Sequence, residues 1–157
     1  ARLSEKSPGG SGLSSMTGKR FIDTNVVVYA YDSSAGTKQA AAQEVLREAA
    51  VGREGVISVQ VLGEFFHATV TRKRLLTSDR ARVAIAALRH LEVASLHETT
   101  VEAALDLHDR FQLRYWDALI VATAKLSGCT RVLSEDLNAG QDYDGVTVVN
   151  PFTVLVP

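Results

Sequence analysis

The sequence predicts an α/β domain of three layers, with helices covering both faces of a central, mainly parallel sheet. Short apolar runs alternate with longer segments of helical periodicity, as expected for parallel strands joined by helices. Two late runs, 131–133 and 146–149, are rich in the β-branched residues that suit buried strands. The chain has 157 residues, 46% of them hydrophobic, which suffices for one domain with a single core.

The first half of the chain predicts two strands and two helices. A short apolar run at 20–22 predicts the first strand, and 55–57 predicts the second. Between them, the alanine-rich segment 37–51 predicts an exposed helix. Ser58 is a suitable N-cap for a helix over 59–72, in which apolar side chains recur at core spacing.

The second half predicts helices over 78–91, 99–111 and 116–126, and strands over 93–96, 131–133 and 146–149. Ser78 or Thr77 caps the first of these helices. Thr99 and Glu102 form a capping-box pattern at the start of the second, and Gly128 ends the third. The expected order is therefore β, α, β, α, α, β, α, α, β, β.

Composition restricts the compartment and the mode of any nucleic-acid contact. Residues 1–15 are polar and rich in Gly and Ser, so we interpret them as a flexible tail left from expression, before a single domain at 16–157. The net charge of -1 argues against a protein that coats long stretches of nucleic acid. Cys129 is the only cysteine, which excludes an internal disulfide and favours a reducing cytoplasm. The longest apolar stretch, 118–124, is too short to span a membrane.

Acidic residues occupy positions where parallel-sheet proteins bind ligands. Asp23 ends the first apolar run, and Asp136 lies just past the strand expected at 131–133. The carboxyl ends of parallel strands form the ligand crevice at the point where the strand order reverses. Asp117 lies in the first turn of an apolar helix, and Glu64 lies among apolar residues of another.

A cluster of these carboxylates has a chemical use. Mg²⁺ and Mn²⁺ prefer oxygen ligands, and divalent ions both activate water and neutralise charge during phosphodiester hydrolysis. Without a cation, the carboxylates repel one another, and the pKa of at least one should rise. The cluster therefore predicts either a bound cation or a shared proton.

Each acid also has a purely structural alternative. Asp117 near a helix start is favoured by the helix macrodipole. Asp23 and Asp136 suit turns that follow strands. Glu64 suits an exposed helix position. The joint occurrence of all four favours the functional interpretation.

The segments FIDTNVVVYA, QVLGEFF, YWDALIVATA and VLSEDLNAG, in that order and followed by GVTVVNPF, resemble the PIN-domain family. The resemblance spans 19–152 and is closest to the VapC-type toxins of bacterial toxin–antitoxin pairs. It implies a PIN-like α/β/α fold.

The resemblance also implies a set of site residues. Asn25 matches a polar position that supports the first aspartate, and Ser134 matches a small hydroxyl position before the last acid. The fourth acid is the least uniform in the family, so Glu135 and Asp142 remain alternatives for it. The implied catalytic and metal-binding residues are Asp23, Glu64, Asp117 and Asp136.

By the same resemblance, the chain is expected to be an Mg²⁺- or Mn²⁺-dependent endoribonuclease, the toxin of a type II toxin–antitoxin system. It would cleave RNA phosphodiester bonds by metal-activated water. The implied partners are an RNA substrate, a cognate antitoxin protein and a second copy in a homodimer. The helix over 37–51 and the Phe65–Phe66 region are candidate dimer surfaces.

Other functions remain in competition. One is a PIN-type nuclease of RNA maturation, with the same chemistry under different regulation. A receiver-like signalling domain needs adjacent acids after its first strand and a lysine after a late strand. FIDTN offers one aspartate, and no lysine follows Leu133. A non-catalytic interaction module, in which the acids are incidental, is the third alternative.

Several weaker signals accompany the acids. The basic run 72–74 and arginines of the following helix are candidates to hold RNA phosphates near the acids. A solvated helix end and helix face is the alternative interpretation. His67 lies three residues after Glu64, so it shares a helix face with that acid. Trp116 is expected to pack in the core, with base stacking as its alternative. Cys129 is expected to be inert.

Overall fold

The computed structural model describes residues 18–153, so the expected tail at 1–15 lies outside the described residues. A sheet with the strand order β3-β2-β1-β4-β6-β5 forms the centre. Its strands are β1 (Arg20–Ile22), β2 (Gly55–Ser58), β3 (Glu92–Ala94), β4 (Arg131–Leu133), β5 (Asp142–Tyr143) and β6 (Val146–Val149). All neighbouring strands pair in parallel except β5, which is antiparallel to β6.

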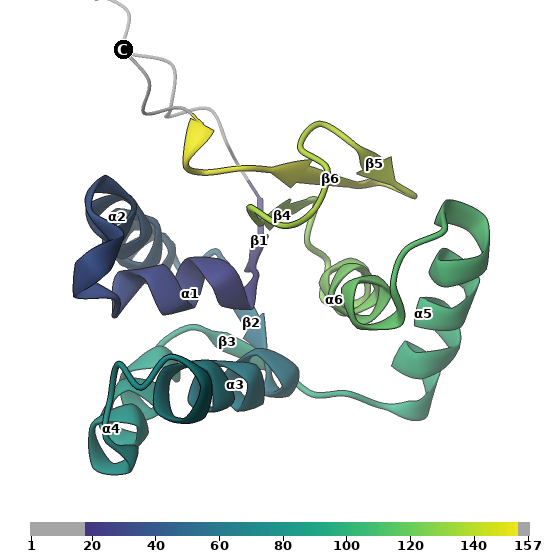
Figure 1. The fold of residues 1–157 in the computed structure, drawn as a ribbon. Helices are drawn as coiled ribbons and strands as arrows, with labels where there is room; N and C mark the ends of the chain where they lie inside the picture. Colours follow the sequence, from purple (N-terminus) through teal and green to yellow (C-terminus); the bar gives the residue numbers. More distant parts are fainter. Residues whose placement is uncertain (1–17, 154–157) are drawn as a thin grey trace, which may run out of the picture.

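Helices cover both faces of this sheet. They are α1 (Thr24–Ala30), α2 (Thr37–Gly52), α3 (Val59–Phe66), α4 (Ser78–Leu88), α5 (Glu98–Phe111) and α6 (Tyr115–Leu126). Figure 1 shows α1 to α4 on one side of the sheet and α5 with α6 on the other. The predicted three-layer α/β/α architecture, with a mainly parallel sheet, is therefore confirmed.

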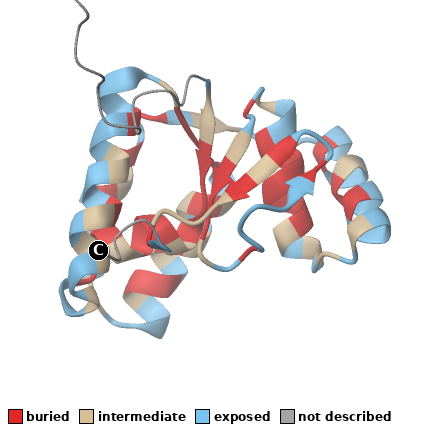
Figure 2. Ribbon diagram, turned by 90° about the horizontal axis from the view of Figure 1, so that it is seen from above, coloured by how far each residue is buried: buried red, intermediate tan, exposed pale blue. Residues whose placement is uncertain are grey.

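The core lies where the strands meet the inner helix faces. The central strands are largely buried, as Figure 2 shows, while the outer faces of the helices are exposed. Phe21 of β1 and Phe65 of α3 are both fully buried. In α6, the whole stretch 118–124 is buried, which explains why that helix is apolar all round. No helix of the described part of the chain combines the length and apolarity needed to cross a bilayer.

Helix α1 has no counterpart among the predicted elements. Its sequence, TNVVVYA, contains three consecutive valines, which disfavour helix by propensity. The helix forms because the Asp23 carboxylate accepts a hydrogen bond from the Thr24 backbone N–H at 2.7 Å, and Val26, Val27 and Val28 are all buried. Packing of α1 against α2 and α3 overrides the weak propensity.

The helix predicted over 59–72 is present, but its second half has a different geometry. After α3, the chain continues as the π-helical segment η2 (His67–Arg72). The Lys73 backbone N–H donates to the Ala68 carbonyl at 2.9 Å, which is the wider i to i+5 pattern. Such segments often lie at functional sites.

Several predicted boundaries are displaced. Strand β3 spans Glu92–Ala94 rather than 93–96. Helix α4 ends at Leu88 rather than at 91. Helix α5 begins at Glu98 because the Thr100 hydroxyl accepts a hydrogen bond from the His97 backbone N–H at 3.1 Å, so the expected cap at Thr99 is displaced. Cys129 is buried, and burial raises its pKa to about 12, so its thiol stays protonated near neutral pH.

The sheet topology creates one reversal point. From β1, the chain moves outward to β2 and β3 with α1 to α4 on one face, and then returns through α5 and α6 to β4 on the other side of β1. The carboxyl ends of β1 and β4 therefore lie side by side, with helices diverging to opposite faces. This is the place where α/β proteins bind their ligands.

Candidate active site

A cavity of about 640 Å³ opens at this reversal point, and all four predicted acids line it. Asp23 follows β1, Glu64 lies on α3, Asp117 lies on α6 and Asp136 follows β4. The structure thus brings together side chains from four separate segments of the chain. The main feature of the site is that these four carboxylates line one cavity.

Asp23 lies deepest and is 7% exposed. One of its carboxylate oxygens accepts the Thr24 backbone N–H, and the other accepts the Ser134 hydroxyl at 2.8 Å. Burial raises the pKa of Asp23 to about 6, the charges of Glu64 and Asp136 act in the same direction, and the hydrogen bonds oppose the shift. A cation that enters the cavity would stabilise the charged form of this carboxylate.

Asn25 connects the ends of β1 and β4. Its amide donates to Asp23 at 3.1 Å and to Asp136 at 3.2 Å, and its carbonyl accepts the Glu135 backbone N–H. The buried Ser134 hydroxyl also accepts the Asp136 backbone N–H at 3.2 Å. Both residues occupy the supporting positions expected from the sequence, and together they hold two acids in fixed orientation.

Glu64 is held by neutral donors. The Thr24 hydroxyl donates to one of its oxygens at 2.6 Å, and the Gln60 amide donates to the other at 2.7 Å. Thr24 therefore couples α3 to the start of α1 beside Asp23. Sequence reasoning missed both donors, although Thr24 lies within the FIDTN motif and Gln60 lies one helical turn before Glu64.

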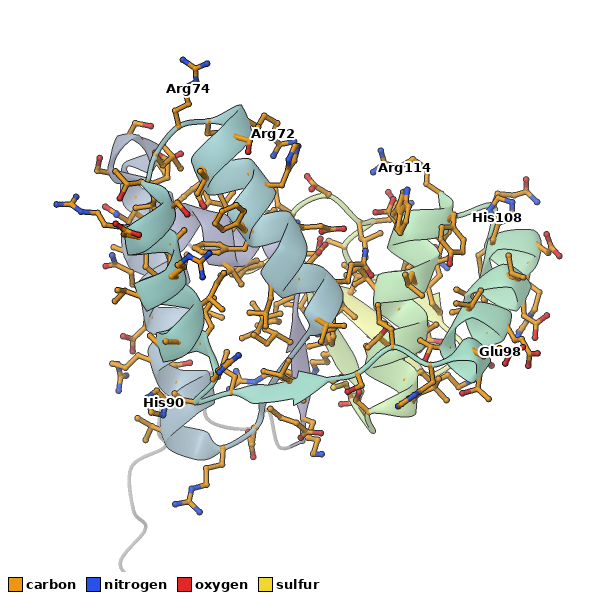
Figure 3. The ribbon with its side chains drawn as sticks, turned by 90° about the horizontal axis from the view of Figure 1, so that it is seen from below. Arg72, Arg74, His90, Glu98, His108 and Arg114 are labelled. Atoms are coloured by element: carbon orange, nitrogen blue, oxygen red, sulfur yellow. The ribbon has the colours of Figure 1, made fainter. Side chains whose placement is uncertain are left out.

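Asp117 has a cationic neighbour on its own helix. The Arg114 guanidinium donates to an Asp117 oxygen at 2.9 Å, and the Arg114 side chain is 80% exposed. Figure 3 shows Arg114 at the start of α6 and Arg72 at the end of η2, on the same edge of the molecule. Because the ion pair is solvated, it holds Asp117 only weakly.

The candidates for the fourth acid lie in different surroundings. Asp136 lines the cavity, whereas Glu135 forms an ion pair with Lys38. Burial alone would raise the pKa of Glu135, but hydrogen bonds from Lys38 and Tyr29 lower it. Asp142 lies on β5, where its oxygens accept hydrogen bonds from Gly145 and Thr147. Of the three, only Asp136 borders the cavity.

The donor set fits a hard divalent cation. Within residues 18–153, no three His, Cys, Asp or Glu side chains converge as a ready metal cluster. The carboxylates nevertheless share one cavity, and carboxylate oxygens are the ligands that Mg²⁺ and Mn²⁺ prefer. In the same part of the chain, Asp23, Glu64 and Asp136 form no ion pair with any Lys or Arg. Their charge is therefore available to a cation.

The cavity lining also carries cationic and aromatic side chains. His67, Arg72 and Lys73 come from the η2 region, and Trp116 comes from α6. The suggestion that the basic run lies near the acids is thus confirmed for these two cations. The expected core position of Trp116 is wrong, because this side chain is 64% exposed.

Comparison with known proteins agrees with this architecture. A family model described as PIN domain matches residues 20–141. No curated protein sequence matches the chain significantly.

Several solved structures share the fold. One is a toxin–antitoxin complex from Klebsiella pneumoniae, with a TM-score of 0.65 and 21% identity, covering 85% of this chain and 98% of that one. Another is the sarcin–ricin-loop-cleaving toxin VapC20 of Mycobacterium tuberculosis, with a TM-score of 0.58 and 22% identity over 75% and 90% of the two chains. A DNA-bound VapBC complex from Salmonella typhimurium has a TM-score of 0.63 and 15% identity over 84% and 97%. With the family model matching most of its length, the chain belongs to the PIN-domain family.

Proposed function

We propose that this chain is a metal-dependent endoribonuclease that acts as the toxin of a toxin–antitoxin pair. The observation that carries the proposal is one cavity lined by Asp23, Glu64, Asp117 and Asp136, three of them without an ion-pair partner within residues 18–153. Membership of the PIN-domain family supports nuclease chemistry. The likeness to solved VapC and toxin–antitoxin structures supports the toxin role.

In this proposal, Asp23 and Asp117 would hold the cation, and Glu64 would assist through water or with a second ion. Asp136 would orient the attacking water or the second ion. A bound Mg²⁺ or Mn²⁺ supplies a Lewis acid and lowers the pKa of a coordinated water.

The chain's own residues supply the rest of the mechanism. Ser134 and Asn25 fix the orientation of Asp23, while Thr24 and Gln60 fix Glu64. Asp23 and Glu64 are thereby oriented before the substrate binds. Arg72 and Lys73, which line the same cavity, are suited to hold RNA phosphates.

We further propose a cognate antitoxin and a homodimer. A cationic side chain of the antitoxin, entering the acidic cavity, would compete with the metal. Phe65 is fully buried, so it is not part of a dimer surface in the described structure; Phe66 is partly exposed and stays a candidate, as does α2.

The direct test is cleavage by the purified protein, freed of antitoxin. Structured RNAs, including tRNAs, are incubated with Mg²⁺, with Mn²⁺ and with EDTA. Metal-dependent cleavage is the expected result. Absence of cleavage together with absence of metal binding by calorimetry would favour the interaction module instead.

Arg114→Gln should strengthen metal binding. The Arg114 guanidinium pairs with Asp117 and so opposes a cation at that carboxylate. An exposed ion pair contributes up to about 1 kcal/mol, so the Mn²⁺ dissociation constant should fall by up to about fivefold in calorimetry. Arg110→Gln, which removes a cation that pairs with Asp144 at 3.4 Å, is the matched control and should leave Mn²⁺ affinity unchanged. Equal affinities for the Arg114 variant and the original protein would contradict the competition.

A further inference from the structure

Trp116 is a large aromatic side chain in an unusual place. It is 64% exposed, although aromatic residues of this size are normally well buried. One side of the ring packs against Tyr115, edge-to-face, with the ring centroids 5.0 Å apart. The Trp116 carbonyl also accepts the Gln60 amide at 3.4 Å. The ring is therefore oriented by its neighbours while much of its surface stays open to solvent.

The position of this ring relates it to the acids. Trp116 immediately precedes Asp117 and lines the same cavity. The Gln60 amide donates both to the Trp116 carbonyl and to Glu64, so it links the start of α6 to one of the acids. Arg72 and Lys73 line this cavity too, so a phosphodiester that they hold keeps its attached nucleoside near the ring, with or without a bound cation.

The remaining wall suits a polyanion. Arg72 and Lys73 line the cavity from the η2 side, and Lys73 lies 3.6 Å from Asp32. Arg72 forms no ion pair with a carboxylate among residues 18–153. Acids for a metal, cations for phosphate and an open aromatic face in one cavity match the three parts of a nucleotide. An apolar protein surface that docked here would bury mostly charged side chains, which is unfavourable.

We propose that Trp116 is the residue on which a base of the RNA substrate stacks, next to the phosphodiester that is cleaved. This inference rests on the proposed nuclease function. Stacking on Trp116 requires a base that is free of its own stack, so it selects RNA with an unpaired nucleotide at the site. Trp116 then positions the substrate and takes no part in the chemical step.

Because Trp116 is the only tryptophan, the protein's fluorescence reports on this ring alone. The measurement uses the whole protein in EDTA, so that no cleavage occurs, titrated with a short unstructured RNA and with the same sequence as a duplex. Saturable quenching by the single strand, and much weaker quenching by the duplex, is expected. No quenching by the single strand overturns the inference. A fluorescence change that follows protein concentration without RNA points to a second copy and also overturns it.

Cleavage kinetics provide the second arm. Trp116→Ala should lower kcat/KM by about 10- to 100-fold, mainly through KM, and Trp116→Phe should restore most of the loss. Leu126→Ala is the matched control, because Leu126 is 58% exposed at the other end of α6 and away from the cavity. Unchanged kcat/KM in Trp116→Ala overturns the inference.

The two arms separate this inference from the nuclease function. Quenching by RNA without cleavage of any RNA keeps Trp116 as an RNA contact and refutes only the nuclease function. Cleavage without quenching refutes only the role of Trp116.

Discussion

Asp23→Asn should lower RNA cleavage on the order of 10³-fold, because it removes the most buried charge of the cavity that holds the metal. The fold should persist. Asn is a good N-cap residue, so it can still accept the Thr24 backbone N–H that begins α1. The measurement is the single-turnover cleavage rate at saturating Mg²⁺. Asp106→Asn, an exposed change on α5, is the control and should cleave normally.

The same variant should change how stability depends on pH when metal is removed. Burial raises the pKa of Asp23 to about 6 in the folded protein, from the ordinary value of 3.8. Because the folded state binds this proton more tightly, the stabilisation is complete below about pH 4 and is lost as pH rises through about 6. The loss amounts to roughly 3 kcal/mol, and Asn at this position does not suffer it.

Urea unfolding in EDTA measures the effect. The unfolding free energy of Asp23→Asn, relative to that of the original protein, should rise between about pH 4 and about pH 7. Asp106→Asn should show no such trend. Parallel pH profiles of unfolding free energy for Asp23→Asn and the original protein would contradict the raised pKa of Asp23 in the folded protein.

Gly55→Ala should destabilise the fold by about 2–3 kcal/mol through overpacking. A Cβ atom at Gly55 would lie 2.6 Å from the Ala49 Cβ of α2 and 2.8 Å from the Leu91 Cδ2. The leucine tip can move, but the Ala49 Cβ is fixed to its helix backbone. Accommodation therefore requires α2 to move away from β2, which lies between β3 and β1 in the sheet.

Gly52→Ala is the matched control for Gly55→Ala. Its new Cβ would approach nothing closer than the Glu54 Cγ at 3.9 Å, and Gly52 lies within α2, where Ala is favoured over Gly. Its unfolding free energy in urea should stay level or rise. Adding Ala49→Gly to Gly55→Ala should recover part of the loss. If Gly55→Ala unfolds at the same urea concentration as the original protein, the close packing of α2 on β2 is refuted.

The fold was largely predictable because most of its strands and helices follow apolar runs or helical periodicity. Strand β5 and helix α1 have no counterpart among the predicted elements. The exceptions have physical causes. The valines of α1 favour a strand by local propensity, and only the Asp23 cap and burial on the sheet make this segment helical. The π-helical turn of η2 depends on a shift of one residue in backbone pairing, which leaves no mark in apolar spacing.

The resemblance of four short motifs to the PIN-domain family implied the four acids, and all four line one cavity in the structure. Their catalytic and metal-binding roles stay a proposal. The exposure of Trp116 and the ion-pair partners of the acids were not predictable from the sequence. Trp116 was assigned to the core by its size, whereas its exposure depends on which face of α6 meets α5 and the sheet. The pairing of Arg114 with Asp117 and of Glu135 with Lys38 depends on long side chains, whose partners only the folded arrangement decides.

The hydrogen bond between Ser134 and Asp23 joins residues 111 positions apart. A ribosome adds roughly 5–20 residues per second, so Ser134 follows Asp23 by roughly 6–22 s. Throughout that interval the growing chain lacks β4 and the Ser134 hydroxyl, one of the groups that orient its first acid. A protein proposed to cut RNA is therefore unable to assemble its cutting centre until the ribosome has passed the codon for Ser134.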